Sequence, residues 1–179
     1  MTRFDPVDIA LYAPSTYVKD GQLGDHFIVG AAGSGKTSLV LALVLDKLMR
    51  GEPVVILDSG RNYLLACRLL DGAYVELRDS EQVQTLSGTA PLTVFDFAGV
   101  TQPYGRAPDE VNRFVGRPDG LLVVDDTANL ERLQVPVREL LRDHVGTGGN
   151  FCVTGQLARD VAAFRGISTQ ARMVTLTRA

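Results

Sequence analysis

Several features that identify common classes of protein are scarce in this chain of 179 residues. It has two cysteines and two histidines, and none of them stands in a cluster, so the sequence predicts neither a disulfide framework nor a metal site built from these residues. Cys67 and Cys152 fall in a predicted helix and a predicted strand, and we expect two buried, reduced thiols. His26 and His144 are isolated, and we expect them at the surface or in loops, without a functional role.

Long apolar runs and an excess of basic residues are also absent. No segment approaches the roughly 20 unbroken apolar residues of a membrane span, and the first residues do not resemble a signal peptide, so we expect a cytoplasmic protein. The formal charge of −3 gives the chain as a whole no basic footprint for nucleic acid. This weighs modestly against DNA binding by the isolated chain and still allows a local basic loop within an oligomer. Length and composition are those of one globular domain without repeats.

The most informative stretch that is present runs from Gly30 to Thr37. It reads G-A-A-G-S-G-K-T and fits the pattern G-x-x-x-x-G-K-[ST] of a phosphate-binding loop. A short apolar run at 27–29 predicts a strand before it, and strong helix formers at 38–50 predict a helix after it. The motif therefore has the structural context that a nucleoside triphosphate site requires.

The chemistry expected of this loop follows from its backbone and from two side chains. Glycines let successive N–H groups turn toward phosphate oxygens, and the helix N-terminus adds partial positive charge. We expect Lys36 to reach the β- and γ-phosphates and the Thr37 hydroxyl to bind Mg²⁺, which makes ATP and Mg²⁺ the predicted ligands. The residues expected to hold the nucleotide are Gly30, Ala31, Ala32, Gly33, Ser34, Gly35, Lys36, Thr37 and Ser38.

Apolar runs and helical segments alternate along the rest of the chain. Further strands are expected at 54–57, 74–77, 92–96, 121–124, 151–154 and 173–176, the second of these at an edge. Helices are expected at 63–70 (capped by Ser59 or Asn62), 108–115, 129–144 (begun or kinked at Pro136) and 157–164. The alternation predicts a three-layer α/β fold of the P-loop NTPase kind, with a mainly parallel sheet covered by helices on both faces. Residues 1–24 are expected to form an N-terminal arm, and 25–179 the ATPase domain.

Polar residues follow the predicted strands. In parallel α/β sheets ligands bind beyond the carboxyl ends of the strands, where Asp58, Asp96, Asp125 and Gln156 join the phosphate loop. Asp125 follows four apolar residues, which is the Walker B pattern, and it is predicted to bind Mg²⁺ directly or through water. For Asp58 and Asp96 the sequence equally allows turn or capping roles.

Asp126 and Gln156 are the remaining catalytic candidates beside Lys36. Asp126 is predicted to orient the attacking water, and Gln156 to sense the γ-phosphate, although a strand-end amide without a role is an equal alternative for Gln156. ATPases of this general type place a longer Glu at the position of Asp126. The shorter side chain therefore predicts slow turnover.

A second short motif, at Asp96–Gly99, matches the D-x-x-G of GTPases. A GTPase would also carry an Asn-Lys-x-Asp motif near a later strand end, and the chain contains none. Because a four-residue pattern with two free positions often arises by chance, the sequence favours ATP over GTP.

The order of four segments gives the chain a family resemblance: G-A-A-G-S-G-K-T, V-V-I-L-D-S-G-R-N-Y, L-L-V-V-D-D and C-V-T-G-Q. It resembles the core of conjugation and type IV secretion ATPases, in the FtsK–HerA group of RecA-like motors, over about residues 27–176, and a viral DNA-packaging ATPase of the same group is an open alternative. The resemblance implies a RecA-like sheet and a ring-forming motor that acts on DNA or on secretion-machine subunits, held by partners at the inner face of a membrane. It also implies an arginine from a neighbouring subunit, for which Arg113, Arg142, Arg165 and Arg178 are equal candidates.

The chain departs from that family pattern in three respects. Gly155 intervenes between Thr154 and Gln156, Asp126 replaces the usual Glu, and the chain has no room for the family's N-terminal domain and inserted helical region.

Two other functions compete with the motor. One alternative is a small P-loop kinase, which would need an arginine-rich lid that the dispersed arginines do not provide. The other is a nucleotide-binding assembly protein with weak hydrolysis.

Overall fold

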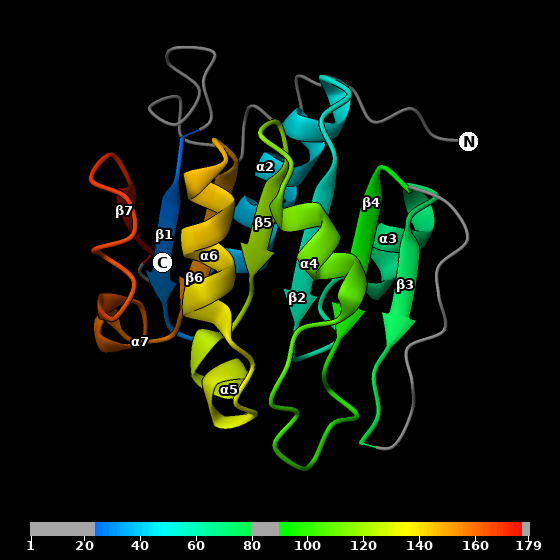
Figure 1. Ribbon diagram of the computed structural model, residues 1–179. Coiled ribbons are helices and arrows are strands. Elements are labelled where there is room, and N and C mark those ends of the chain that lie inside the picture. The colour runs from blue at the N-terminus through cyan, green and yellow to red at the C-terminus, as the bar shows by residue number, and fades with distance from the viewer. Residues whose placement is uncertain (1–23, 80–89, 177–179) are drawn as a thin grey trace.

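A parallel sheet forms the centre of the computed structural model, which describes residues 24–79 and 90–176 (Figure 1). Its seven strands lie in the order β3-β4-β2-β5-β6-β1-β7, and every neighbouring pair is parallel. The strands are β1 (His26–Gly30), β2 (Val54–Asp58), β3 (Ala73–Glu76), β4 (Leu92–Asp96), β5 (Leu121–Val124), β6 (Asn150–Gly155) and β7 (Arg172–Leu176). The helices are α2 (Lys36–Met49), α3 (Leu64–Leu69), α4 (Asp109–Val115), α5 (Thr127–Arg132), α6 (Val137–Gly146) and α7 (Ala158–Ala162).

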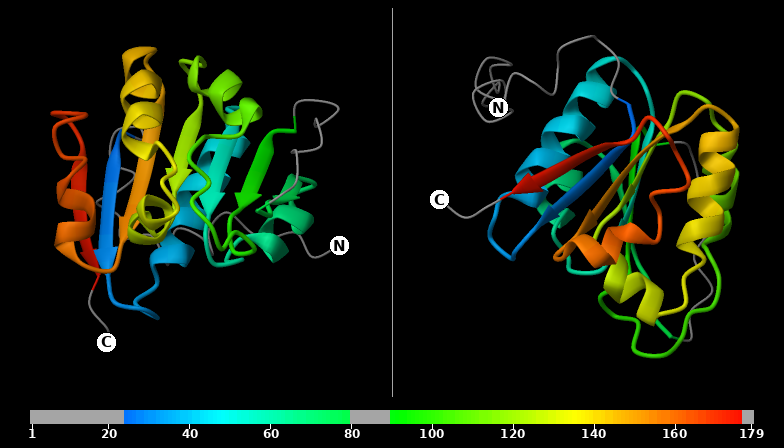
Figure 2. Two further views of the ribbon diagram at one scale, coloured as in Figure 1. Left: turned by 60° about the horizontal axis from the view of Figure 1, so that its bottom comes forward. Right: turned by 90° about the vertical axis from the view of Figure 1, so that its left-hand side faces the viewer.

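Helices cover both faces of the sheet, so the molecule has three layers. Figure 2 shows α2 on one face and α6 on the opposite face when the sheet is seen from its edge. Successive strand residues point to opposite faces, and on β2 this places Val54 and Ile56 in a core with α2 and α3. Val55 and Leu57 lie in the other core, with α4, α5 and α6. Strands that are apolar on both sides therefore form the continuous runs seen in the sequence.

The strand order determines which residues meet at the carboxyl edge. β1, which leads into the phosphate loop, does not pair with β5, which carries the two carboxylates; β6 lies between them and pairs with both. α5 and α7 lie at this edge, beside the ends of β5 and β6 (Figure 1). The end of β6 is therefore inserted between the phosphate loop and the carboxylates.

The fold class predicted from the sequence is confirmed, and each predicted strand is present. The helical segment predicted at 129–144 forms two helices, and Pro136 stands at the N-cap of the second, so of the two predicted effects of this proline it begins a helix. α7 is shorter than predicted. The proposed N-terminal arm, except for Gly24, lies outside the described residues.

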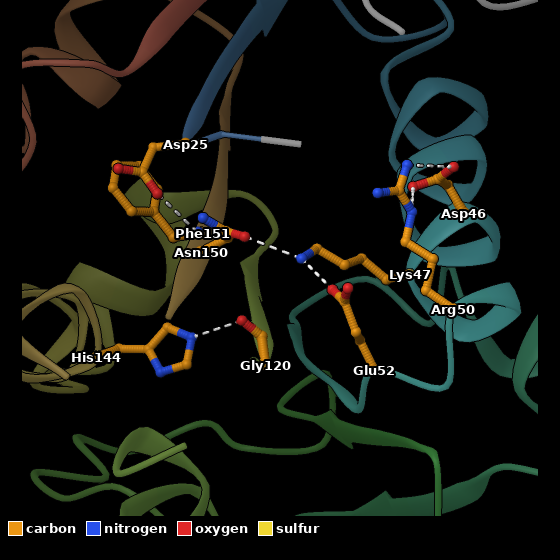
Figure 3. A network of polar contacts seen from close by, with 9 residues as sticks. All are labelled: Asp25, Asp46, Lys47, Arg50, Glu52, Gly120, His144, Asn150 and Phe151. Carbon is orange, nitrogen blue, oxygen red and sulfur yellow. Dashed lines mark hydrogen bonds and ion pairs between the residues drawn. The ribbon is translucent and has the colours of Figure 1, made fainter. Parts of the chain in front are cut away.

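A polar network stabilises the opposite, amino-terminal edge (Figure 3). Lys47, near the end of α2, is almost completely buried, forms an ion pair with Glu52 and donates a hydrogen bond of 2.9 Å to Asn150 Oδ1. The Asp25 carboxylate accepts the backbone N–H of Phe151 at 3.2 Å. Since α2 begins at the phosphate loop and β6 ends beside it, these contacts fix the two elements relative to each other.

The expectation that both histidines lie at the surface was wrong. His26 is 2% exposed within β1, and His144 is fully buried in α6. The ring nitrogens of His144 lie 3.1 Å from the carbonyl oxygens of Val115 and of Gly120, and its ring stacks on Phe114. A histidine that is isolated in the sequence is thus a packed part of the core, where a ring N–H can donate to one of these carbonyl oxygens.

The expectation of buried, unpaired thiols is correct for both cysteines. Among the helices that the structure describes, none combines the length and the apolar character needed to cross a membrane.

Candidate functional site

A cavity of about 240 Å³ opens at the carboxyl edge of the sheet, beside the ends of β1, β5 and β6. It brings four of the predicted loop residues together with both predicted carboxylates and with Gln156, which stand more than 80 residues further along the chain. The lining residues are Ala32, Gly33, Lys36, Thr37, Asn62, Asp125, Asp126, Thr154, Gly155 and Gln156. Gly30, Ala31, Ser34, Gly35 and Ser38, which were also predicted to hold the nucleotide, are not among the lining residues.

The phosphate loop has the backbone conformation that its glycines allow. Gly33 and Gly35 have φ angles of 76° and 91°, in the left-handed region that disfavours residues with a Cβ atom. Gly35 is the N-cap of α2, and no side chain caps the helix, whose first turn contains no acidic residue. The first turn of α2, whose N–H groups have no side-chain cap, lies at the cavity through Lys36 and Thr37, and the partial positive charge of a helix N-terminus favours an anion there.

Gly30 is required for a different reason, close packing. A Cβ atom at this position would meet the Ser34 hydroxyl and would lie 2.8 Å from the backbone carbonyl oxygen of Leu176. Leu176 is the last residue of β7, which pairs with β1 and limits any outward movement of the loop. The first glycine of the motif thus lets the loop turn against the neighbouring strand.

Lys36 is held by the loop itself. Its ammonium group donates hydrogen bonds to the carbonyl oxygens of Gly30, at 2.6 Å, and of Ala31, at 3.1 Å. These bonds keep the positive charge at the cavity. There the charge lowers the pKa of Asp126, although burial and the charges of Asp125 and Asp160 raise that pKa by more. Thr37 follows on the first turn of α2 and also lines the cavity.

Asp125 is 4% exposed, and protein donors reach both of its carboxylate oxygens. The Thr154 hydroxyl lies 2.5 Å from Oδ1, and the Asn62 side-chain amide donates to Oδ2 at 3.1 Å. Each carboxylate oxygen has a second lone pair, so the carboxylate can bind a cation or a metal-bound water while it keeps both donors. Asp125 is consequently oriented before any ligand arrives.

Asp126 has an uncommon backbone conformation for its residue type. Its φ and ψ angles are 58° and 69°, and its N–H donates to Thr154 Oγ1 at 3.0 Å. Burial raises the pKa of its carboxyl, and the negative charges of Asp125 and Asp160 raise that pKa further. A raised pKa strengthens a carboxylate as a base, and left-handed backbone at a cavity marks a position where geometry is imposed by the surroundings.

The turn after β2 differs from the sequence prediction. Neither Ser59 nor Asn62 caps α3, whose N-cap is Tyr63 and which has no side-chain cap. Asn62 instead donates to Asp125, and the buried Asp58 carboxylate accepts the backbone N–H of Gly60 at 2.9 Å and that of Tyr63 at 3.3 Å. Asp58 therefore shapes the turn that presents Asn62 to the cavity, which agrees with the turn role that the sequence allowed.

Gln156 lies at the rim and is exposed. The Asp160 carboxylate accepts hydrogen bonds from the backbone N–H groups of Gln156 at 3.0 Å and of Leu157 at 2.8 Å, and so fixes the turn between β6 and α7.

Three residues of the site were not predicted from the sequence: Asn62, Thr154 and Asp160. Only their spacing from strand ends could have indicated them.

Two groups of candidates do not reach the cavity. Asp96 is buried, accepts the Ala98 N–H at 2.8 Å and pairs with Arg61, so its carboxylate has a structural partner in a different place from the lining residues. This position gives the GTPase motif no support. No arginine of the described residues lines the cavity, and Arg178 lies outside them.

Comparison with known proteins agrees with this fold and motif. A family model described as the TraG P-loop domain matches residues 5–85, somewhat less than half of the chain. VirB4 of Thermoanaerobacter pseudethanolicus is similar in structure, with a TM-score of 0.65 at 14% identity, over 87% of this chain and 77% of that one. The SWI2/SNF2 ATPase core of Sulfolobus solfataricus, in complex with dsDNA, gives 0.46 at 11% identity over 86% and 40%, which is too low to support an argument. The curated proteins contain no match.

The parallel sheet, the glycine-rich loop and the uncapped helix end define a protein of the P-loop NTPase class. Within that class the chain resembles the conjugation ATPases: the TraG P-loop model matches residues 5–85, and VirB4 has a similar fold. The resemblance drawn from the order of the four sequence segments is thereby confirmed.

Proposed function

We propose that this chain binds Mg-ATP and hydrolyses it as the motor domain of a conjugation or type IV secretion ATPase. One observation carries the proposal: a single cavity joins an uncapped helix N-terminus, a lysine and a hydroxyl on one side to two adjacent carboxylates on the other. These are the parts that phosphoryl transfer to water requires, namely phosphate binding, metal binding and activation of water.

The residues of the loop bind the phosphates in this proposal. The N–H groups at the start of α2 and the Lys36 ammonium neutralise the phosphate charge, after Lys36 has exchanged its bonds to Gly30 and Ala31 for phosphate oxygens. The Thr37 hydroxyl and the Asp125 carboxylate would hold Mg²⁺ between them. Bound Mg²⁺ would offset negative charge on the phosphates.

Asp126 acts as the base that orients the attacking water and takes its proton. Burial raises its pKa, which makes the carboxylate a better proton acceptor. Gln156, at the exposed rim, contacts the γ-phosphate and links its loss to movement of the turn before α7. The short Asp126 side chain makes turnover slow.

The motor would work as a homo-oligomer that acts on DNA or on secretion-machine subunits at the inner face of a membrane. The described lining residues include no arginine, which agrees with an arginine supplied by a neighbouring subunit. A nucleotide-binding assembly protein with weak hydrolysis is the second candidate, because Asp126 replaces a longer residue.

Two measurements test the proposal. Calorimetric titration of ATP with and without Mg²⁺ should show tight binding that depends on Mg²⁺, and Lys36→Ala should abolish it. Phosphate release, measured with and without DNA, should be detectable and should increase with oligomerisation seen by size-exclusion chromatography. Absence of ATP binding would refute the proposal, whereas binding without phosphate release under any condition would support the assembly protein instead.

A further inference from the structure

The Thr154 side chain lies between the two carboxylate residues and contacts both. Thr154 is fully buried near the end of β6. Its hydroxyl oxygen is 2.5 Å from Asp125 Oδ1 and 3.0 Å from the backbone nitrogen of Asp126. One hydroxyl thus links the predicted metal ligand to the predicted base.

Elementary hydrogen-bond chemistry fixes the direction of both bonds. The Asp126 N–H can only donate, so the Thr154 oxygen must accept from it. The Thr154 hydroxyl donates its single proton to Asp125 Oδ1. Both bonds are therefore made by the same group without conflict, and only a side chain that both donates and accepts can replace it.

The next residue repeats this connection through the backbone. Thr127 Oγ1 donates to the Thr154 carbonyl oxygen at 3.3 Å and to the Asp160 carbonyl oxygen at 3.1 Å. Three consecutive residues after β5 are thus fixed to one residue of β6. This connection holds Asp126 in its left-handed conformation, which a free chain would rarely adopt.

We propose that Thr154 is a positioning residue for hydrolysis, which rests on the function proposed above. Its hydroxyl sets the orientation of the Asp125 carboxylate toward Mg²⁺ and, through the Asp126 N–H, the direction in which the Asp126 side chain enters the cavity. Thr154 acts through these two residues, although its side chain also lines the cavity.

The decisive variants are Thr154→Val and Thr154→Ser. Valine keeps the shape and removes the hydroxyl, so turnover should fall about 10- to 100-fold, and the gain in ATP affinity on adding Mg²⁺ should shrink by a similar factor. ATP affinity without Mg²⁺ should change by less than about twofold, since the phosphate loop is untouched. Serine keeps the hydroxyl and should retain most of the wild-type turnover and Mg²⁺ response.

A pair of smaller variants and one measurement on the unchanged protein complete the test. Thr154→Ala and Thr154→Ser both remove the methyl group and differ only in the hydroxyl, so alanine should lose the Mg²⁺ response and serine should keep it. In the wild type, the Asp126 amide should be protected from hydrogen exchange, and an unprotected amide would overturn the inference even if the variants fail to fold.

The two proposals fail in different ways. Wild-type turnover together with an equally active Thr154→Val protein would overturn the positioning role and leave the ATPase intact. If wild type binds Mg-ATP without hydrolysing it, the Mg²⁺ response of the valine variant still decides the inference. Wild-type protein that binds no ATP would overturn both.

Discussion

Replacement of Asp126 by Asn tests the catalytic role of this residue, because the substitution should lower the rate of hydrolysis and leave ATP binding and stability nearly unchanged. The backbone of Asp126 has φ 58° and ψ 69°, a conformation that Asn adopts more readily than most residues. The amide keeps the size of the side chain and cannot take a proton from water. We therefore expect Asp126→Asn to fold as the wild type does and to bind Mg-ATP with an affinity within about threefold, since the loop and Asp125 are unchanged.

The size of the loss follows from the role of a general base. Such a group contributes typically about 10²- to 10⁴-fold to the rate, so phosphate release should fall by that factor. Asp126→Ala should lose the same activity and, in addition, about 1 kcal/mol of stability, because alanine has a Cβ atom and no local hydrogen bond to support the left-handed conformation. Chemical denaturation of both variants measures this difference.

Steady-state phosphate release and nucleotide titration on the same preparations provide the test. Hydrolysis by Asp126→Asn at the wild-type rate would show that another group activates water and would remove Asp126 from the mechanism. Asp126→Glu gives the opposite test: if the short side chain limits the rate, the longer carboxylate should increase turnover, and a decrease would refute that explanation.

Three further predictions concern the loop, the turn after β2 and pH. Gly30→Ala should lower the free energy of unfolding, measured by urea denaturation, by about 1 to 3 kcal/mol, because its Cβ atom would lie 2.8 Å from the Leu176 carbonyl oxygen. The control Gly116→Ala places its Cβ atom in open space and should change stability little. Equal effects of the two substitutions would refute the packing argument. Asn62→Ala, which removes the donor to Asp125 Oδ2, should weaken Mg²⁺-dependent ATP binding by roughly 10-fold and leave the melting temperature nearly unchanged, and an unchanged Mg²⁺ titration would contradict this. Burial raises the pKa of Asp58 to about 6, against hydrogen bonds from the Gly60 and Tyr63 N–H groups. Because the pKa of Asp58 is higher in the folded than in the unfolded state, the protonated carboxyl contributes to the free energy of unfolding below about pH 4, and this contribution is lost as the pH rises through 6. Between these pH values the free energy of unfolding of the wild type should fall by roughly 2 kcal/mol more than that of Asp58→Asn. Equal pH dependence of the two proteins would show that burial does not govern this group.

Local features of the chain were readable from the sequence because short-range chemistry determines them. Continuous apolar runs such as that of β5 form strands covered on both faces, and Pro136 cannot continue a helix. The phosphate loop was predicted residue by residue, since its conformation depends on glycines within the motif itself. The family resemblance rested on the order of such local segments.

The environment of single side chains was not readable in the same way. His144 was expected at the surface or in a loop, yet it is buried in α6, where its ring nitrogens lie 3.1 Å from the carbonyl oxygens of residues 115 and 120 and a ring N–H can donate to one of them. Asn62 was expected to cap a helix, and its amide instead reaches the carboxylate of a residue 63 positions away. In both cases the deciding partner is remote in sequence, and no local pattern records it.

The sequence by itself determined the strands, the phosphate loop and the two carboxylates as separate parts. Only the tertiary structure decided how they combine, because β6 lies between β1 and β5 although it comes last of the three along the chain. That order places the Thr154 hydroxyl between Asp125 and Asp126, within hydrogen-bonding distance of both. Strand pairing depends on contacts between distant segments, so the position of this hydroxyl follows from the packing of the whole sheet.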